Sequence, residues 1–334
     1  MQVSRDFEKL LKDLQEPDSS DETLRGLSNL LAEERQRLSE MWHSIAVEQR
    51  RSTVKRLIEI AEVDIETDFT QVFMMCLKDA DPQVRASAID GLWENEDVML
   101  IRPLVELLGG DDSALVQEAS ATSLSRFALL AELGRLQPRL ADMVWEALWK
   151  AVHDPRKDLD VRRRAVESLA YFSRKEVREV IERAYQDDED RVRISAVFAM
   201  GRSADERWAD VIIKELETED PEMRYEAVRA SGALRIAETV PMLARMVVDP
   251  DPEVKLMAIW SLGQIGGPEA RRVLQICYEQ GDEALQDAAQ EALAEMDFMQ
   301  GSLDFTMYDF GMAASDEDES PDENEDWDDT RFYM

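Results

Sequence analysis

Few side chains in this sequence could do acid–base, nucleophilic or metal chemistry. There are two histidines, His43 and His153, and two cysteines, Cys76 and Cys277. Catalytic and metal sites need several such groups at one place, and neither histidine is part of an H-E-x-x-H motif. The cysteines form no C-x-x-C pair and no disulfide framework, which favours a reducing compartment. We therefore expect no enzyme activity, no cofactor and no metal, and a cytoplasmic location.

An acidic run at residues 316–329 is the remaining candidate for cation binding, with ten acidic residues in fourteen. An EF-hand loop needs glycine at its sixth position and glutamate at its twelfth, where this run has Pro321 and Trp327. We therefore expect no dedicated calcium site. Because like charges repel one another, residues 298–334 are expected to form a disordered acidic tail. The tail could act as a solubilising brush or carry a docking motif. The docking interpretation depends on its aromatic residues, Phe305, Tyr308, Phe310, Trp327 and Phe332.

The chain is strongly acidic, since 73 Asp and Glu against 39 Lys and Arg give a formal charge of -34. Nucleic acids and anionic membranes bind clustered cations, so this charge disfavours both as partners. No run approaches 18 apolar residues, and the first residues lack the pattern of a signal peptide. The charge favours another protein with a basic surface as the partner. The sequence indicates no oligomeric state.

A repeat runs through the chain and predicts the elements that must position any site. Runs such as DPQVRASAIDGL from Asp81 and DPEVKLMAIWSLG from Asp251 share an apolar residue followed by Arg or Lys. Counted from that apolar residue as zero, positions zero, four and eight form one stripe of a helix, with a small residue at four. The last four intervals between copies are 31 residues each, and residues 126–153 hold an insertion. The zero positions are Val84, Val116, Val161, Val192, Met223, Val254 and Leu285.

Each copy also carries signs of a helix start. Three residues before zero stand Asp81, Ser113, Asp158, Glu189, Asp220, Asp251 and Asp282. We expect the Asp and Ser residues of this column to cap the helix, and proline follows three of them. A second helical pattern lies between successive copies, so each unit is a helix pair. One pair cannot bury both of its apolar faces, but stacked pairs share a continuous core. We predict an all-α fold, an α-solenoid of stacked antiparallel helix pairs.

The D-x-D-P-x-V-R-x-x-A runs resemble the HEAT-repeat family, especially its short bacterial type, also seen in phycobilisome-lyase-like proteins, over residues 64–297. The resemblance implies a HEAT/armadillo-like superhelix, with residues 1–63 as a helical N-terminal cap. In HEAT repeats, an Asp and an Arg six residues later build a ladder between neighbouring repeats, and Asp79 and Arg85 match this pattern. In the repeat next to the insertion, Gln117 occupies the position where this Arg is expected.

The resemblance also implies that the second helix of each pair lines the concave side. Positions two and six of that helix point away from its packed stripe. In three adjacent repeats these positions carry apolar and aromatic residues around one arginine, a pattern typical of a protein interface. The alternative is that curvature of the array or the tail covers them. The predicted protein-binding residues are Ile194, Phe198, Tyr225, Arg229, Leu256 and Trp260.

These observations favour a protein–protein interaction scaffold or adaptor that binds a client protein on the concave face. The alternative is an enzyme-associated maturation factor or chromophore-lyase-like factor of the HEAT-repeat type. In the insertion, Trp145 and Trp149 are one helical turn apart. We expect both to pack over the enlarged repeat, with an exposed aromatic contact as the alternative.

Overall fold

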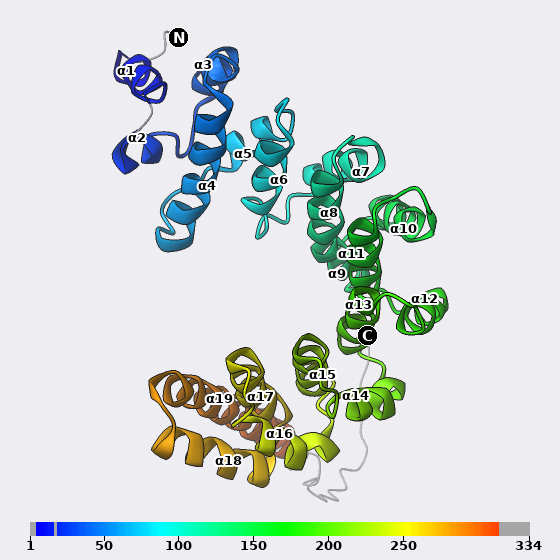
Figure 1. Ribbon diagram of the computed structural model, residues 1–334. Helices are drawn as coiled ribbons and strands as arrows, with labels where there is room; N and C mark the ends of the chain where they lie inside the picture. The colour runs from blue at the N-terminus through cyan, green and yellow to red at the C-terminus, as the bar shows by residue number, and fades with distance from the viewer. Residues whose placement is uncertain (1–4, 17–18, 314–334) are drawn as a thin grey trace, which may run out of the picture. The chain divides into compact units, whose positions relative to one another are not determined.

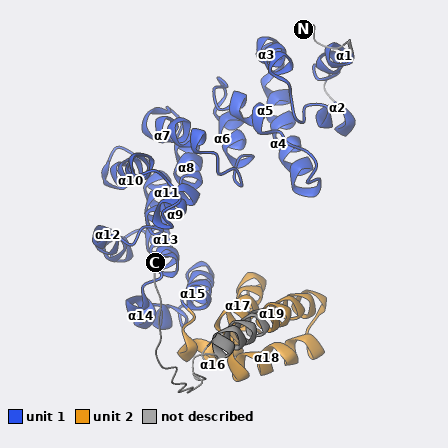
Figure 2. Ribbon diagram, turned by 180° about the vertical axis from the view of Figure 1, so that it is seen from behind, with its two compact units in different colours: residues 1–234 blue, residues 235–334 orange. Residues whose placement is uncertain are grey.

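The structure, a computed structural model, describes residues 5–16 and 19–313 (Figure 1). Every regular element in these residues is a helix, which confirms the predicted all-α fold of stacked helix pairs. Two compact units, residues 1–234 and 235–334, divide the chain (Figure 2). The second unit contains α16 (Val240–Met246), α17 (Pro252–Ile265), α18 (Gly267–Gln280) and α19 (Glu283–Ala313).

The first unit begins with four helices that precede the regular repeats and continues with helix pairs. The first four are α1 (Arg5–Asp13), α2 (Asp21–Arg25), α3 (Ala32–Trp42) and α4 (Val47–Val63). The others are α5 (Thr70–Cys76), α6 (Pro82–Asp90), α7 (Ile101–Gly110), α8 (Ala114–Ser123), α9 (Ser125–Glu132), α10 (Pro138–His153), α11 (Leu159–Leu169), α12 (Lys175–Tyr185), α13 (Asp190–Arg202), α14 (Ala209–Glu215) and α15 (Pro221–Ala233).

The predicted caps begin most of the second helices of the pairs. The side chains of Asp81, Asp158, Asp220 and Asp251 accept hydrogen bonds from backbone N–H groups of the first turns of α6, α11, α15 and α17. Ser113 was expected to do the same for α8 but makes no side-chain cap hydrogen bond. Its own N–H donates to the Asp111 carboxylate at 2.9 Å, so an aspartate two residues earlier organises that turn.

Close packing of the second helices forms an inner layer in the first unit. Successive members α6, α8, α11, α13 and α15 pack against one another, while α5, α7, α10, α12 and α14 each pack on the helix that follows them. The small residues at position four are fully buried along this layer: Ala88, Ser120, Ala165, Ala196 and Ala227. Gly201 shows how close the layer is, because a Cβ there would lie 2.8 Å from Ala230 Cα. Small side chains therefore permit the stacking.

The insertion, residues 126–153, contains most of the short helix α9 and the whole of the long helix α10. The rings of Trp145 and Trp149 on α10 stack with centroids 5.3 Å apart, and Trp145 meets the buried Phe172 edge-on at 5.3 Å. Both tryptophans are half-buried. The pair therefore packs on the enlarged repeat, as predicted, and leaves part of each ring open to solvent.

Helix α19 continues to Ala313, whereas we expected the tail to begin at residue 298. The segment after Asp297 contains no proline until Pro321, so the backbone meets no strong helix breaker there. Phe305, Tyr308 and Phe310 lie in this helix, and their side chains are outside what the structure describes. Trp327 and Phe332 also lie outside the described residues.

Candidate functional site

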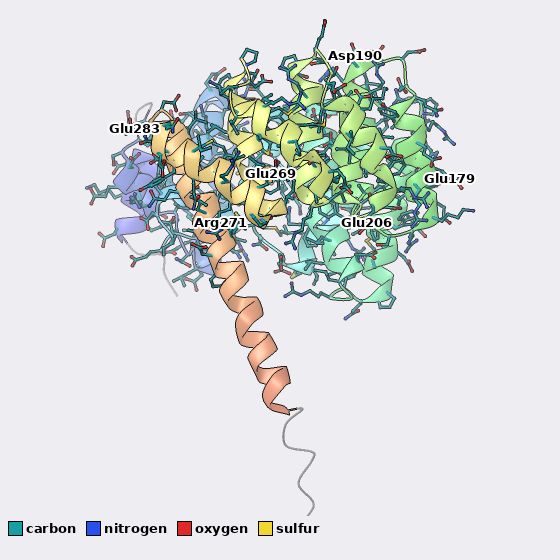
Figure 3. The ribbon with its side chains drawn as sticks, turned by 90° about the horizontal axis from the view of Figure 1, so that it is seen from below. Glu179, Asp190, Glu206, Glu269, Arg271 and Glu283 are labelled. Carbon is teal, nitrogen blue, oxygen red and sulfur yellow. The ribbon has the colours of Figure 1, made fainter. Side chains whose placement is uncertain are left out.

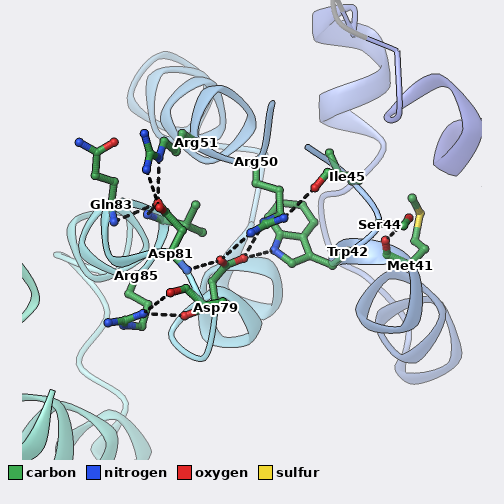
Figure 4. A network of polar contacts seen from close by, with 12 residues as sticks. Met41, Trp42, Ser44, Ile45, Arg50, Arg51, Asp79, Asp81, Gln83 and Arg85 are labelled. Carbon is green, nitrogen blue, oxygen red and sulfur yellow. Dashed lines mark hydrogen bonds and ion pairs between the residues drawn. The ribbon is translucent and has the colours of Figure 1, made fainter. Parts of the chain in front are cut away.

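A buried polar ladder joins the first repeats. The Asp79 carboxylate, between α5 and α6, accepts hydrogen bonds from Trp42 Nε1 at 2.6 Å and from Arg50 Nε and Nη2 at 2.9 and 3.1 Å (Figure 4). The backbone N–H of Asp81 donates to the same carboxylate at 2.8 Å. The Asp79 side chain has no solvent exposure (0%). With these partners in place, Asp79 holds the stack together and is not available as a base.

Arg85 carries the ladder to the next repeat. Its Nη1 donates to the Asp79 carbonyl oxygen at 2.8 Å, while its Nε and Nη2 bind the Asp111 carboxylate at 2.8 and 2.7 Å. Hydrogen bonding to Asp111 raises the pKa of Arg85. The arginine side chain thus pairs with the aspartate of the following repeat, and reaches only the backbone of the aspartate six residues before it.

Next to the insertion, Lys157 extends the ladder. Gln117 Nε2 donates to the Asp111 carbonyl oxygen, the same backbone contact that Arg85 makes to Asp79. Lys157 Nζ then donates to Gln117 Oε1 at 2.8 Å and to the Leu108 carbonyl oxygen at 2.7 Å. Burial lowers the pKa of Lys157. Gln117 stands where the repeat pattern has an arginine, and Lys157, from the segment before α11, supplies the cation at this point of the ladder.

On the inner layer, equivalent positions of α13 and α15 lie side by side. The Arg229 guanidinium lies 4.0 Å over the centre of the Phe198 ring, and the Arg202 guanidinium lies 5.5 Å from the same ring. Arg229 Nε also donates to Glu226 Oε2 at 2.7 Å. Burial raises the pKa of Glu226, while its ion pair with Arg229 opposes this. Phe198 and Arg229, both predicted binding residues, therefore contact each other on one face.

Other side chains complete this face. Ile194 and Tyr225 are half-buried on α13 and α15, like Phe198. Arg202 is exposed and also lies 5.9 Å from the ring of Tyr171, at the end of the preceding repeat. Sequence periodicity did not single out Tyr171 or Arg202, because both fall outside positions two and six. We call the following set the inner-face cluster: Tyr171, Ile194, Phe198, Arg202, Tyr225 and Arg229.

The two remaining predicted residues belong to the second unit. Leu256 and Trp260 are both on α17, and each is 39% exposed. The packed stripe of the same helix is fully buried at Val254, Ala258 and Leu262. Within that unit, α17 therefore presents an apolar edge to solvent on the side away from its packed stripe.

Toward α8 and α11 the inner layer changes from aromatic to charged. Arg164 Nε and Nη1 bind Glu118 Oε1 at 3.1 Å and Glu167 Oε2 at 2.9 Å. Ser195 Oγ donates to Glu167 Oε1 at 2.5 Å. These charges satisfy one another, so this part of the layer offers a partner less than the aromatic part does.

The histidines and cysteines do not assemble a site. His43 and His153 are exposed, and His153 Nδ1 lies 2.8 Å from the Trp149 carbonyl oxygen. Both cysteines are buried with free thiols, and burial raises the pKa of each, which disfavours the reactive thiolate. Within residues 5–16 and 19–298, no three His, Cys, Asp or Glu side chains are grouped so that they could hold a metal ion.

A family model of HEAT repeats matches residues 70–159, 145–214 and 209–294, which together are more than half of the sequence. The chain belongs to the HEAT-repeat family. In this HEAT-repeat protein the matches begin at α5 and end within α19, so they include Asp79, Arg85 and Asp111 of the ladder and the whole inner-face cluster. A search of the curated proteins finds no match.

Several solved structures are similar to this HEAT-repeat protein. The CpcE–CpcF complex of phycocyanin lyase from Nostoc sp. PCC7120 matches with 17% identity and a TM-score of 0.41, over 57% of this chain and 74% of that one. Human deoxyhypusine hydroxylase matches with 15% identity and a TM-score of 0.34, over 88% and 96%. Kap95p, bound to RanGDP, matches with 13% identity and a TM-score of 0.46, over 88% and 45%. Likenesses of this degree carry no statement about activity.

Membrane insertion has no candidate in the part of the chain that the structure describes. There, no helix combines the length and the apolar character needed to cross a bilayer.

Proposed function

We propose that this HEAT-repeat protein is a non-enzymatic scaffold that binds a client protein through the inner-face cluster. The observation that supports this most is the contrast between the two sides of α13 and α15. One side is fully packed, at Ala196 and Ala227, whereas the other leaves Phe198 and Tyr225 half-open. Leu256 and Trp260 of the second unit offer a further apolar contact of the same kind.

The geometry of the cluster suits protein recognition. The Phe198 ring is fixed by Arg229 on its face, and Arg229 is itself held by Glu226. Fixed side chains lose little conformational entropy when a partner binds, so their contacts contribute more to affinity. Aromatic and arginine side chains are also the types that most often dominate protein interfaces. Apolar side chains of a client would therefore find a pre-arranged surface here.

The charge of the chain supports a basic client surface. Exposed acidic side chains such as Glu179, Asp190 and Glu206 project from the first unit (Figure 3). A negative field of this kind speeds the approach of a basic partner more than it raises the final affinity. The two unpaired, buried cysteines agree with a cytoplasmic setting for this encounter.

The test compares two isoleucine-to-glutamate substitutions in the full-length protein. Ile194→Glu places a charge in the inner-face cluster, while Ile276→Glu places the same charge on α18, where the isoleucine is 44% exposed. Proteins captured from a lysate are quantified by mass spectrometry for the wild type and both variants. We expect at least one protein to be lost with Ile194→Glu and retained with Ile276→Glu. If both variants capture what the wild type captures, the cluster is not the client site.

A further inference from the structure

A groove with both apolar and polar lining lies at one end of α4 and α6, away from the inner-face cluster. Its volume is about 510 Å³, and it is formed by the end of α4, the loop after it, the start of α5 and the turn after α6. Phe73 is buried and forms part of the lining, while Trp93 and Ile65 at the edges are 62% and 98% exposed. Large apolar side chains held in water beside a groove mark a contact site for another molecule. We call this feature the Trp93 groove.

Hydrogen bonds fix the loop that carries Ile65. The Glu66 N–H donates to Asp64 Oδ1 at 3.1 Å, and the Thr67 N–H donates to the Asp64 carbonyl oxygen at 3.1 Å. The Asp68 N–H donates to Ser28 Oγ at 2.8 Å, which ties the loop to the segment after α2. Ile65 therefore extends into solvent from a hydrogen-bonded turn.

The opposite wall is fixed as well. A Cβ on Gly91 would lie 2.7 Å from the Phe73 ring, so the end of α6 approaches that ring closely. Asn95 Nδ2 donates to Thr70 Oγ1 at 3.3 Å, and Arg126 Nε donates to the Asn95 carbonyl oxygen at 2.8 Å. Both walls are thus pre-arranged, which lowers the entropic cost of filling the groove.

The charged side chains that line the Trp93 groove all have one sign. Three carboxylates line it, those of Glu62, Asp68 and Glu94, and all three residues are exposed. Its lining includes no lysine or arginine. Residues 316–329 of the same chain are acidic, so repulsion disfavours them as the occupant. A segment with flanking cations would instead place its charges beside these carboxylates.

We propose that the Trp93 groove binds a short segment of another protein, with apolar side chains at its centre and lysine or arginine on both sides. The apolar centre fills the space between Ile65, Phe73 and Trp93. The flanking cations pair with Glu62 and Glu94. A groove of this volume holds a few side chains, in keeping with a short linear segment and not with a whole domain. This site is separate from the inner-face cluster and does not depend on it.

The test uses three fluorescein-labelled peptides and the full-length protein, with binding followed by fluorescence anisotropy. The first peptide is Lys-Arg-Gly-Leu-Phe-Leu-Gly-Lys-Arg, the second has serines in place of Leu-Phe-Leu, and the third has glutamates in place of the four cations. We expect saturable binding of the first peptide, binding of the second that is weaker by about tenfold or more, and no binding of the third. If the first does not bind, or the second binds as well as the first, the proposal is wrong.

Matched variants locate the binding site. Trp93→Ala should weaken binding of the first peptide by about tenfold, while Trp260→Ala on α17 should leave this binding unchanged. Glu62→Gln with Glu94→Gln should weaken it by about threefold, whereas Glu179→Gln with Glu182→Gln, which changes the net charge equally, should not. An unchanged affinity in Trp93→Ala, or an equal loss in Trp260→Ala, overturns the assignment.

A second copy of the chain is the competing occupant. Light scattering of the wild type and of Trp93→Ala measures the mass in solution. A mass that falls on this substitution would show that the groove joins two copies, which also overturns the proposal. Ile194→Glu should leave peptide binding intact, so a failure of the Trp93 groove and a failure of the inner-face cluster are distinguishable.

Discussion

The Asp79→Asn substitution is the sharpest test of the ladder that stacks the first repeats. It preserves the shape of the side chain and removes its charge. Four hydrogen bonds converge on this carboxylate, from Trp42, from two nitrogens of Arg50 and from the Asp81 N–H. An asparagine has one acceptor oxygen, so its amide group must face at least one of these donors. Arg50, whose side chain is only 9% exposed, then loses its counter-ion.

The magnitude follows from this burial. Breaking a buried ion pair by neutralising one partner costs about 3–5 kcal/mol, because the other charge stays desolvated. The control is Asp154→Asn, since Asp154 pairs with Arg156, whose side chain is 85% exposed. Solvent-exposed ion pairs contribute about 0–1 kcal/mol to the free energy of unfolding. We therefore expect Asp79→Asn to lower the free energy of unfolding by several times more than Asp154→Asn.

Urea unfolding at neutral pH, followed by circular dichroism at 222 nm, measures this difference. Helical repeat arrays can unfold in parts, so hydrogen exchange over residues 32–90 should be measured as well. The double variant Arg50→Met with Asp79→Leu removes both charges and should be less damaging than the two single losses added together. If Asp79→Asn and Asp154→Asn agree within about 0.5 kcal/mol, and exchange over residues 32–90 is unchanged, the ladder does not stabilise the stack.

Three further predictions follow from the packing, the ion pairs and the charge. Ala227 is fully buried where α15 meets α13, so Ala227→Glu should lower the stability of the fold by about 3 kcal/mol or more. Ala233→Glu, at the exposed end of α15, should lower it only a little. Equal melting temperatures of the two variants would contradict this. Hydrogen bonding from Arg51 lowers the pKa of Asp81 from 3.8 to about 2, so its contribution to stability is present above about pH 4 and is lost as the pH falls toward 2. The stability difference between the wild type and Arg51→Met should therefore shrink as the pH falls from about 4 to about 2, and a difference that stays constant over this range would refute this cause. For a basic client identified by capture, the association rate should fall as the salt concentration rises from about 0.05 to 0.5 M, and a constant rate would show that the negative charge does not steer it.

Much of the fold was predictable because its signals are local. A cap such as Asp81, a proline after it and a small residue such as Ala88 all act within one or two helical turns, and each is readable as a pattern. The same locality explains the two departures. Ser113 stands at a cap position, yet Asp111 organises that turn, and α19 passes Asp297 because no strong breaker follows it.

The sequence by itself determined that this protein is an all-α repeat array, that position four of the second helices is small and buried, and that the chain is strongly acidic. It did not determine the burial of every position, since Arg229 was expected to point away from the packed stripe and is 7% exposed. Only the tertiary structure decided which charges meet: Arg85 pairs with Asp111, and Trp42 reaches Asp79 across 37 positions. It also placed Arg229 over Phe198 and left Trp93 and Ile65 open beside one groove. The physical reason is that helix formation depends on neighbours within a turn, whereas these contacts depend on how helices cross and how loops close, which no short pattern encodes.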